Sequence, residues 1–354
     1  MQQTKRSSQD SNISQNKSNP QSKNKYKRRS FLRLIINEEN SFQQKGYGLV
    51  VSALIAMFFM FVLPYIGKTY LYPTFMNLKK SQGWADWQVF IFFTLLIQYS
   101  LVIVFNSMYV IIYKLNLPFF EQYKVNSELW PWQEQSEEKK KEWKLLKWKL
   151  IRNIPYIYFV ILPPIYILGA YNNKWESLFR MELESFPGPK EICIQLLFCT
   201  ICEDLSFHLI HKIMHLKYIY PYVHKKHHEV RLNVAAAYIY QSGLDFVISG
   251  VFPSTIGQLI LGGRMHYFTY LMWITLRITE TMDGHCGYEF PWSPYRLIPF
   301  AASTTYHDFH HSKNVGNYSS FFTFWDTVFG DNRVFYEYQE RLKNEKLIIK
   351  SKQN

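Results

Sequence analysis

The chain is poor in cysteine, with four among its 354 residues. Four cysteines are too few for a disulfide framework. Cys199 and Cys202 form a CxxC inside an apolar run, but there is no second pair to complete a zinc site. The first long apolar run starts only near Tyr47, so we expect no signal peptide. A fold that depends on a disulfide framework is therefore excluded.

Histidine is absent from the first 207 residues, and all eleven histidines lie between His208 and His311. Random scatter would give this distribution with a probability on the order of one in ten thousand. The net charge of +13 is partly concentrated in basic runs such as residues 25–29. Because no base-stacking motif accompanies these runs, they indicate membrane topology rather than nucleic-acid binding.

Long apolar runs define the fold class. They cover residues 47–66, 89–113, 154–170, 191–214, 245–261 and 267–281. A helix needs about 20 apolar residues to cross a bilayer. The sequence therefore predicts an all-α, integral membrane helical bundle with about four to six spans or half-spans. Three prolines within 154–170 predict a kinked or interrupted helix there.

Changes in composition divide the chain into four regions. Residues 1–30 form a polar, basic tail that we expect to be disordered. Residues 31–170 form an N-terminal transmembrane region, in which 134–150 have the composition of an interfacial amphipathic helix or of an ordinary solvated helix. Residues 171–335 carry every histidine, and 336–354 form a polar C-terminal tail.

The histidines occur in closely spaced boxes. His211 and His215 form HxxxH on a helical stretch, so both imidazoles face one side. Two HxxHH boxes and a single residue complete the set: His224, His227, His228, His285, His307, His310 and His311. These are more ligands than one ion needs, which predicts a pair of zinc, copper or iron ions. His208 and His266 lie outside the boxes, and we expect both to be structural.

Carboxylates lie close to the boxes in sequence. Glu203 and Asp204 precede the first box by two turns, Glu280 and Asp283 precede His285, and Asp308 lies within the last box. Such carboxylates can fix imidazole tautomers around a metal. They could also be surface charges at the membrane face.

Residues 120–335 resemble the fatty acid hydroxylase and sterol desaturase superfamily, and within it the sterol C4-methyl oxidases. The resemblance lies in Glu203-Asp204, the three boxes, Glu280-Thr281, His285-Cys286-Gly287-Tyr288, Gly316-Asn317-Tyr318 and Trp325-Asp326. It implies a di-iron site in a cytosolic helical cap, held by the nine box histidines. The family often has a further histidine where this chain has Glu289, which makes Glu289 a candidate ligand. Another departure is residues 240–243, where the family commonly has His-Pro.

The resemblance also implies an activity. It predicts an O2-dependent monooxygenase of the endoplasmic reticulum membrane, with its active site toward the cytosol. Electrons from NAD(P)H would arrive through cytochrome b5 and its reductase, and the substrate would be a C4-methyl sterol. A sterol desaturase, a sterol side-chain dealkylating enzyme, a fatty acid or sphingolipid hydroxylase and a non-catalytic metal transporter are the alternatives. The lysines of 350–354 resemble a retrieval signal of that compartment.

Overall fold

A computed structural model describes residues 46–353, which contain helices and loops but no extended strand. The predicted all-α class is therefore confirmed for this part of the chain. The tail of residues 1–30 and the basic run at 25–29 lie outside the described residues, as does the start of the predicted 31–170 region.

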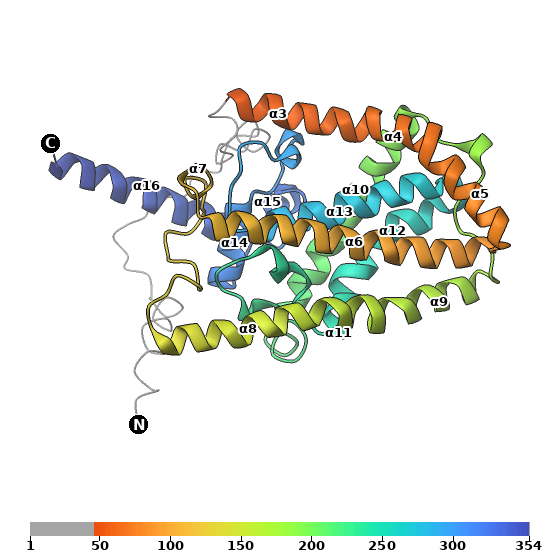
Figure 1. Cartoon of the computed structure of the whole chain (residues 1–354). Helices are drawn as coiled ribbons and strands as arrows, with labels where there is room; N and C mark the ends of the chain where they lie inside the picture. Colours follow the sequence, from red (N-terminus) through yellow and green to blue (C-terminus); the bar gives the residue numbers. More distant parts are fainter. Residues whose placement is uncertain (1–45, 354) are drawn as a thin grey trace. The chain divides into compact units, whose positions relative to one another are not determined.

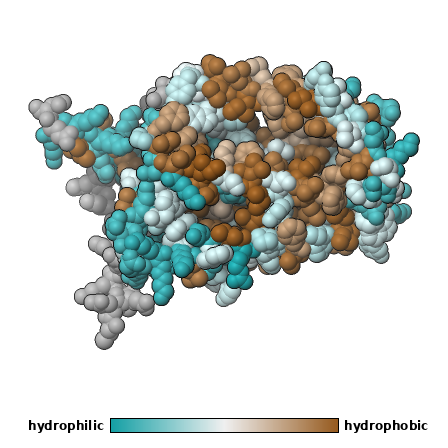
Figure 2. Space-filling view, viewed as in Figure 1, coloured by the Kyte–Doolittle hydropathy of each residue, from teal (hydrophilic) through white to brown (hydrophobic). Residues whose placement is uncertain are grey.

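Five helical segments within 46–353 are long and apolar enough to cross a membrane. In chain order they are Gly46–Gln82 (α3 to α5), α6 (Asp86–Leu115), Glu137–Asn172 (α8 and α9), α10 (Pro189–Met214) and Gly243–Arg264 (α11 and α12). This number falls within the predicted four to six. In Figure 2, apolar residues form a band across these helices, with hydrophilic residues toward both ends, as expected for a protein that spans a bilayer.

Prolines inside the long helices follow π-helical turns. The turns η3 (Phe58–Val62), η4 (Gly67–Leu71), η5 (Tyr156–Ile161) and η9 (Phe246–Val251) each end two residues before a proline. A proline lacks an N–H and crowds the carbonyl four residues earlier, and a wider π turn relieves that clash. The helix predicted to be kinked or interrupted within 154–170 therefore continues past Pro163 to Asn172.

The amphipathic segment at 134–150 is not a separate helix. It forms most of α8 (Glu137–Pro155), which passes directly into η5 and α9 (Leu162–Asn172). Leu145 and Trp148 are exposed along α8, whereas Leu150 is buried. One continuous helix therefore carries both the charged segment and the apolar run that follows it.

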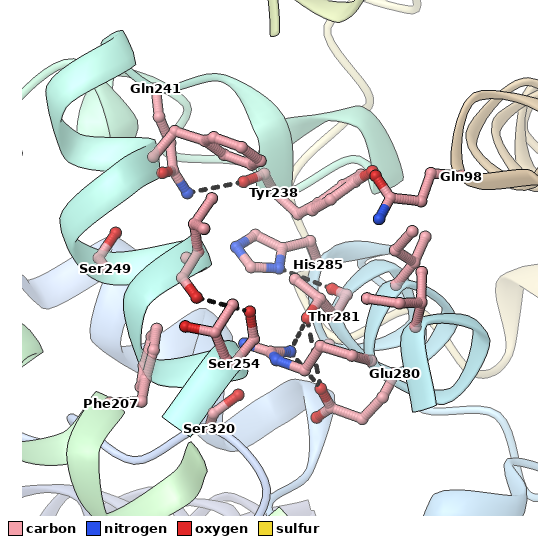
Figure 3. A pocket seen from close by; sticks show the side chains of 18 of the residues that line it. Gln98, Phe207, Tyr238, Gln241, Ser249, Ser254, Glu280, Thr281, His285 and Ser320 are labelled. Carbon is pink, nitrogen blue, oxygen red and sulfur yellow. Dashed lines mark hydrogen bonds and ion pairs between the residues drawn. The ribbon is translucent and has the colours of Figure 1, made fainter. Parts of the chain in front are cut away.

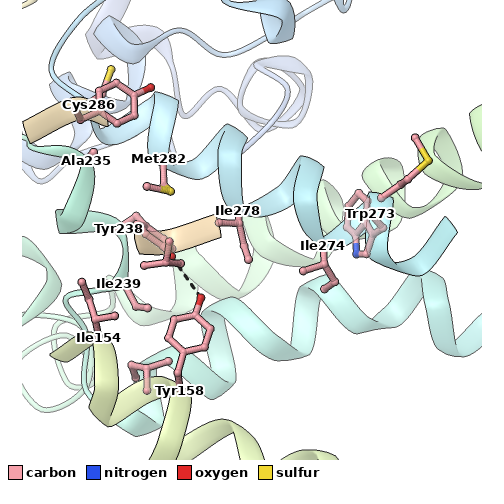
Figure 4. Packing of buried hydrophobic residues seen from close by; sticks show 14 of the residues in the cluster. Ile154, Tyr158, Ala235, Tyr238, Ile239, Trp273, Ile274, Ile278, Met282 and Cys286 are labelled. Carbon is pink, nitrogen blue, oxygen red and sulfur yellow. Dashed lines mark hydrogen bonds between the residues drawn. The ribbon is translucent and has the colours of Figure 1, made fainter. Parts of the chain in front are cut away.

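Helix α13 (Tyr267–His285) lies at the centre of the bundle. It packs against α6, α10, α14 (Thr304–Lys313) and η8 (Ala235–Ile239). Figure 4 shows its buried side chains, including Ile278 and Met282, facing Tyr158 and Tyr238 from other elements. The apolar run at 267–281 thus belongs to a core helix, and α13 is not among the five segments that are apolar enough to cross a membrane.

The remaining helices gather at the end of the bundle where α6 and α13 finish (Figure 1). They are α7 (Pro118–Glu121), α14, α15 (Phe324–Phe329) and α16 (Arg333–Gln353). The residues of the predicted polar tail at 336–353 are helical and belong to α16.

Candidate metal centre

The nine histidines of the boxes come together at one end of the bundle. His211 ends the apolar part of α10 and His215 caps the helix, while His285 is the last residue of α13. α14 presents His307, His310 and His311, and the loop after α10 presents the middle box, His224, His227 and His228. Two helix ends and α14 therefore bring side chains from distant parts of the sequence to one place.

The imidazoles fall into two groups, and within each group the candidate ligand atoms lie within 4.8 Å of one another. The five-histidine group contains His211, His215, His224, His228 and His310. The four-histidine group contains His227, His285, His307 and His311. The groups adjoin, since the rings of His228 and His311 stack with centroids 4.6 Å apart. This geometry fits two neighbouring metal ions, the number predicted from the sequence.

Hydrogen bonds fix the tautomers in the five-histidine group. His211 Nδ1 lies 2.8 Å from the Tyr318 carbonyl oxygen, and His310 Nδ1 lies 2.6 Å from that of Gly316. A carbonyl only accepts, so both Nδ1 atoms carry the proton and both Nε2 atoms carry a lone pair. His224 Nδ1 likewise lies 3.0 Å from the Asp245 carboxylate.

These lone pairs point at one another. Nε2 of His211 lies 3.1 Å from Nε2 of His224 and 3.3 Å from that of His215. Nε2 of His310 is buried without a hydrogen-bond partner among the described residues. Facing lone pairs repel, and a buried unpaired nitrogen is costly. A cation held between them removes both penalties, so the residues fit a metal ion.

The four-histidine group has the same construction. His285 Nδ1 donates to the Thr281 carbonyl at 2.8 Å, which leaves its Nε2 with a lone pair. That Nε2 lies 3.0 Å from His307 Nε2, which in turn lies 3.1 Å from His311 Nε2. Cis ligands about 2.1 Å from a metal are roughly 3 Å apart. The spacing therefore suits imidazoles that share one ion.

Burial keeps the loop and α14 imidazoles neutral. Removal from water lowers the pKa of His227, His228, His307, His310 and His311 well below the ordinary value. A neutral imidazole is the form that binds a metal. These five histidines can therefore act as donors at neutral pH.

A cavity leads from the two groups into the bundle. His211, His224, His227, His285 and His307 line one part of it. Mostly apolar and aromatic side chains of α9, η9 and α13 line the rest, together with polar side chains of α12 (Phe252–Leu261) and Gln98 of α6 (Figure 3). The space between these atoms, including the open mouth, is about 1210 Å³. Its mouth is open and its lining is mostly apolar, so an apolar molecule can reach the histidines.

The carboxylates expected to fix tautomers bind elsewhere. Glu203 and Glu280 pair with Arg277. Asp204 accepts the N–H groups of residues 320–322, and Asp308 accepts from Asn233. None of the four bonds to an imidazole within the described part of the chain. Burial raises the pKa of Asp308 to about 6. These residues support the surrounding segments, and they do not orient the box histidines.

Glu289 also lies outside both histidine groups. Its Oε1 accepts from Arg296 Nε at 2.9 Å, and its Oε2 accepts from the Thr305 N–H at 2.9 Å. Arg296 also donates to Asp283. The carboxylate thus ties the loop after α13 to the first turn of α14, a role that differs from the ligand role suggested by the resemblance.

Asp245 is the residue that the sequence reasoning missed. It is fully buried, and it orients His224 while accepting from the Ser249 hydroxyl at 2.9 Å. The available signal was a single carboxylate at the start of the apolar run 245–261.

The two histidines outside the boxes have structural contacts. His266 Nδ1 accepts from the Phe268 N–H and caps α13, while its Nε2 donates to the Glu182 carbonyl. His208 lies between Asp326 and Asp331, and Lys212 also binds Asp331. The lysine makes that small cluster a poor cation site. These contacts agree with the structural roles expected for both.

Comparison with known proteins first gives the class. Residues 196–331, which include every box histidine, match the Fatty acid hydroxylase family. With its membrane helices and paired histidine groups, the chain is a membrane-bound, oxygen-dependent oxidoreductase of that class. No solved structure gives a significant match.

Individual relatives identify the particular family within this class. Methylsterol monooxygenase 1 of Gallus gallus is 32% identical over 234 residues, which are 66% of this chain and 74% of the relative. Methylsterol monooxygenase erg25B of Aspergillus fumigatus is 32% identical over 59% of this chain and 67% of the relative. Methylsterol monooxygenase 2-2 of Arabidopsis thaliana is 36% identical over 43% and 58%. The chain belongs to the methylsterol monooxygenase family.

Proposed function

We propose that this protein oxidises the C4 methyl group of a sterol with O2, using two iron ions held by the nine box histidines. The observation that carries the proposal is the cavity, because imidazoles of both histidine groups line the same apolar space. A lipid in that space brings a C–H bond to the metals without crossing water. The names of the relatives supply the sterol and the methyl group.

The protein contributes to the reaction by binding the metal ions and the substrate and by excluding water. Bound iron would supply O2 activation and removal of hydrogen from the methyl group. His211, His285 and His310 keep Nε2 unprotonated because their Nδ1–H groups donate to backbone carbonyls. The apolar walls of α9, η9 and α13 orient the substrate and exclude water. Each hydroxylation inserts one oxygen atom, and the second leaves as water after two electrons arrive.

Those electrons need an external source. We infer a donor of the cytochrome b5 type with its NAD(P)H-dependent reductase. Nine of the eleven histidines belong to the two groups, and the other two, His208 and His266, are held by separate structural contacts, so neither group of contacts leaves a histidine pair for a haem in this sequence.

The location follows from charge. α8 begins at the same end of the bundle as the histidines (Figure 1) and carries Lys139, Lys140, Lys141 and Lys144 in its first turns. Lysines are enriched on the cytosolic side of spans. We therefore infer a multi-pass protein of the endoplasmic reticulum membrane with its histidine site facing the cytosol.

Sterol profiling of cells that lack the protein tests this function. Accumulation of 4-methyl sterols, rescued by the wild type and not by His310→Ala or His311→Ala, is the expected result. Accumulation of a desaturase or side-chain substrate would assign a different sterol reaction, and an unchanged profile would overturn the sterol assignment. Purified protein should contain about two irons per chain, whereas zinc without iron would favour a transporter.

A further inference from the structure

A charged patch lies on the cavity wall beside the four-histidine group. Arg277, Glu280 and Thr281 of α13 all line the cavity, as Figure 3 shows for Glu280 and Thr281. Arg277 Nη1 donates to Glu280 Oε2 at 2.8 Å and also contacts the Thr281 hydroxyl. Arg277 Nε lies 2.9 Å from Oε1 of the buried Glu203. The guanidinium is therefore held by carboxylates from two helices.

Two polar atoms of this patch have no protein partner. Glu280 Oε1 and Arg277 Nη2 make no hydrogen bond to any residue between 46 and 353, and the Glu280 side chain is only 9% exposed. Neither atom belongs to the fully buried unpaired atoms of the described residues, so both can be reached by a molecule in the cavity. Glu280 Oε1 accepts a hydrogen bond and Arg277 Nη2 donates one, so together they match a ligand group that can both donate and accept.

We propose that Arg277, Glu280 and Thr281 bind a hydroxyl group of the lipid substrate and thereby select the carbon that faces the histidines. A hydroxyl donates to Glu280 Oε1 and accepts from Arg277 Nη2. A ketone can only accept, so it leaves the carboxylate oxygen unpaired. This inference rests on the proposed function and adds the substrate group that the site recognises.

The position of the patch suits the reaction. The Thr281 carbonyl accepts from His285 Nδ1 at 2.8 Å, so a single residue contacts both the patch and a histidine of the metal centre. Residues four apart on a helix are separated by about one turn, roughly 6 Å. The hydroxyl of a sterol is on C3, next to C4. Glu280 precedes His285 by five residues on α13, a rise of about 7.5 Å, so a hydroxyl held at Glu280 keeps the neighbouring C4 methyl groups at the histidine end of the cavity.

The test compares a 4-methyl sterol bearing a 3-hydroxyl with its matched 3-ketone. Equilibrium binding of each probe, and turnover, are measured on purified, iron-loaded protein at about pH 8. Burial raises the pKa of Glu280 to about 7, so its carboxyl is mostly ionised at that pH. We expect the wild type to prefer the hydroxyl roughly tenfold or more in both Kd and kcat/KM. Glu280→Gln should bring the preference near unity or reverse it, because the amide can donate to the ketone.

Two further variants make the test specific. Thr275→Val is the matched control, because Thr275 lies on α13 outside the cavity lining and its hydroxyl bonds only to the Leu271 carbonyl; its preference should equal that of the wild type. Thr281→Val keeps all charges and should lower the preference about threefold. If Glu280→Gln loses its iron or fails to fold, the probe preference of Thr281→Val decides the test.

The outcomes separate the inference from the function on which it rests. Equal binding of both probes by the wild type overturns the inference, as does an unchanged preference in Glu280→Gln or, if that variant does not fold, in Thr281→Val. A wild type that binds the hydroxyl selectively but oxidises no 4-methyl sterol supports the binding site and overturns the proposed function.

Discussion

His224 connects Asp245 to His211. Its Nδ1–H donates to the Asp245 carboxylate at 3.0 Å, and its Nε2 lies 3.1 Å from Nε2 of His211. A carboxylate at the start of the apolar segment Gly243–Arg264 thus orients an imidazole of the five-histidine group. Such a partner fixes the tautomer and raises the basicity of the ligand before any metal binds.

Asp245→Asn should therefore weaken iron binding by about 10- to 100-fold. The amide can donate to Nδ1, which would move the imidazole proton to Nε2 and block the donor atom. Iron affinity is measured by competition with a chelator on purified protein. Ser249→Ala is the control, since it removes one hydroxyl bond and keeps the carboxylate, and its iron affinity should change less than about threefold. Wild-type iron affinity in Asp245→Asn would contradict the orienting role.

His310→Ala should abolish activity and reduce iron from about two to about one per chain. The buried Nε2 of His310 has no hydrogen-bond partner among the described residues, so its main role is that of a donor. His266→Ala provides the comparison, because that histidine caps α13. Its loss should cost about 1 kcal/mol of stability and leave the iron content unchanged. Equal iron loss in both variants would show a general folding defect.

Much of the site could be predicted because histidine spacing reports helical geometry directly. His211 and His215 share a helix face at a separation of four residues, and His307 and His311 repeat this spacing on α14. The middle HxxHH box lies in the loop after α10, so its placement did not follow from helical spacing. The structure brings all nine box histidines into the two groups. Division into five and four could not be predicted, since it depends on how α10, α13 and α14 approach one another.

The orienting contacts could not be predicted either. His211, His285 and His310 are oriented by backbone carbonyls of Tyr318, Thr281 and Gly316, and a carbonyl has no sequence signature. Carboxylates near the boxes in sequence were the obvious candidates, but Arg277 and backbone N–H groups bind them. The apolar run at 267–281 resembled a span in length, but over its whole length α13 contains Arg277, Glu280 and Asp283 and is not among the five segments apolar enough to cross a membrane.

Glu289→Gln should lower stability while leaving about two irons bound in the folded protein. Glu289 forms a buried ion pair with Arg296, and breaking such a pair costs about 3 to 5 kcal/mol when one charge remains unpaired. Asp283 also pairs with Arg296, which should keep the loss nearer the lower limit. Thermal unfolding and iron content are measured together. A loss of one iron at unchanged stability would instead make Glu289 a ligand.

Gly257→Ala should destabilise the bundle by about 1 to 3 kcal/mol. A Cβ on Gly257 would lie 2.8 Å from Cα of Cys199, so α12 and α10 can pack at this distance only because glycine has no side chain. Gly169→Ala on α9 is the matched control, since a Cβ there meets nothing within 4 Å. That variant should gain up to about 1 kcal/mol from helix propensity. Thermal unfolding in detergent measures both, and equal effects would show that propensity, and not the contact between α10 and α12, sets the stability at Gly257.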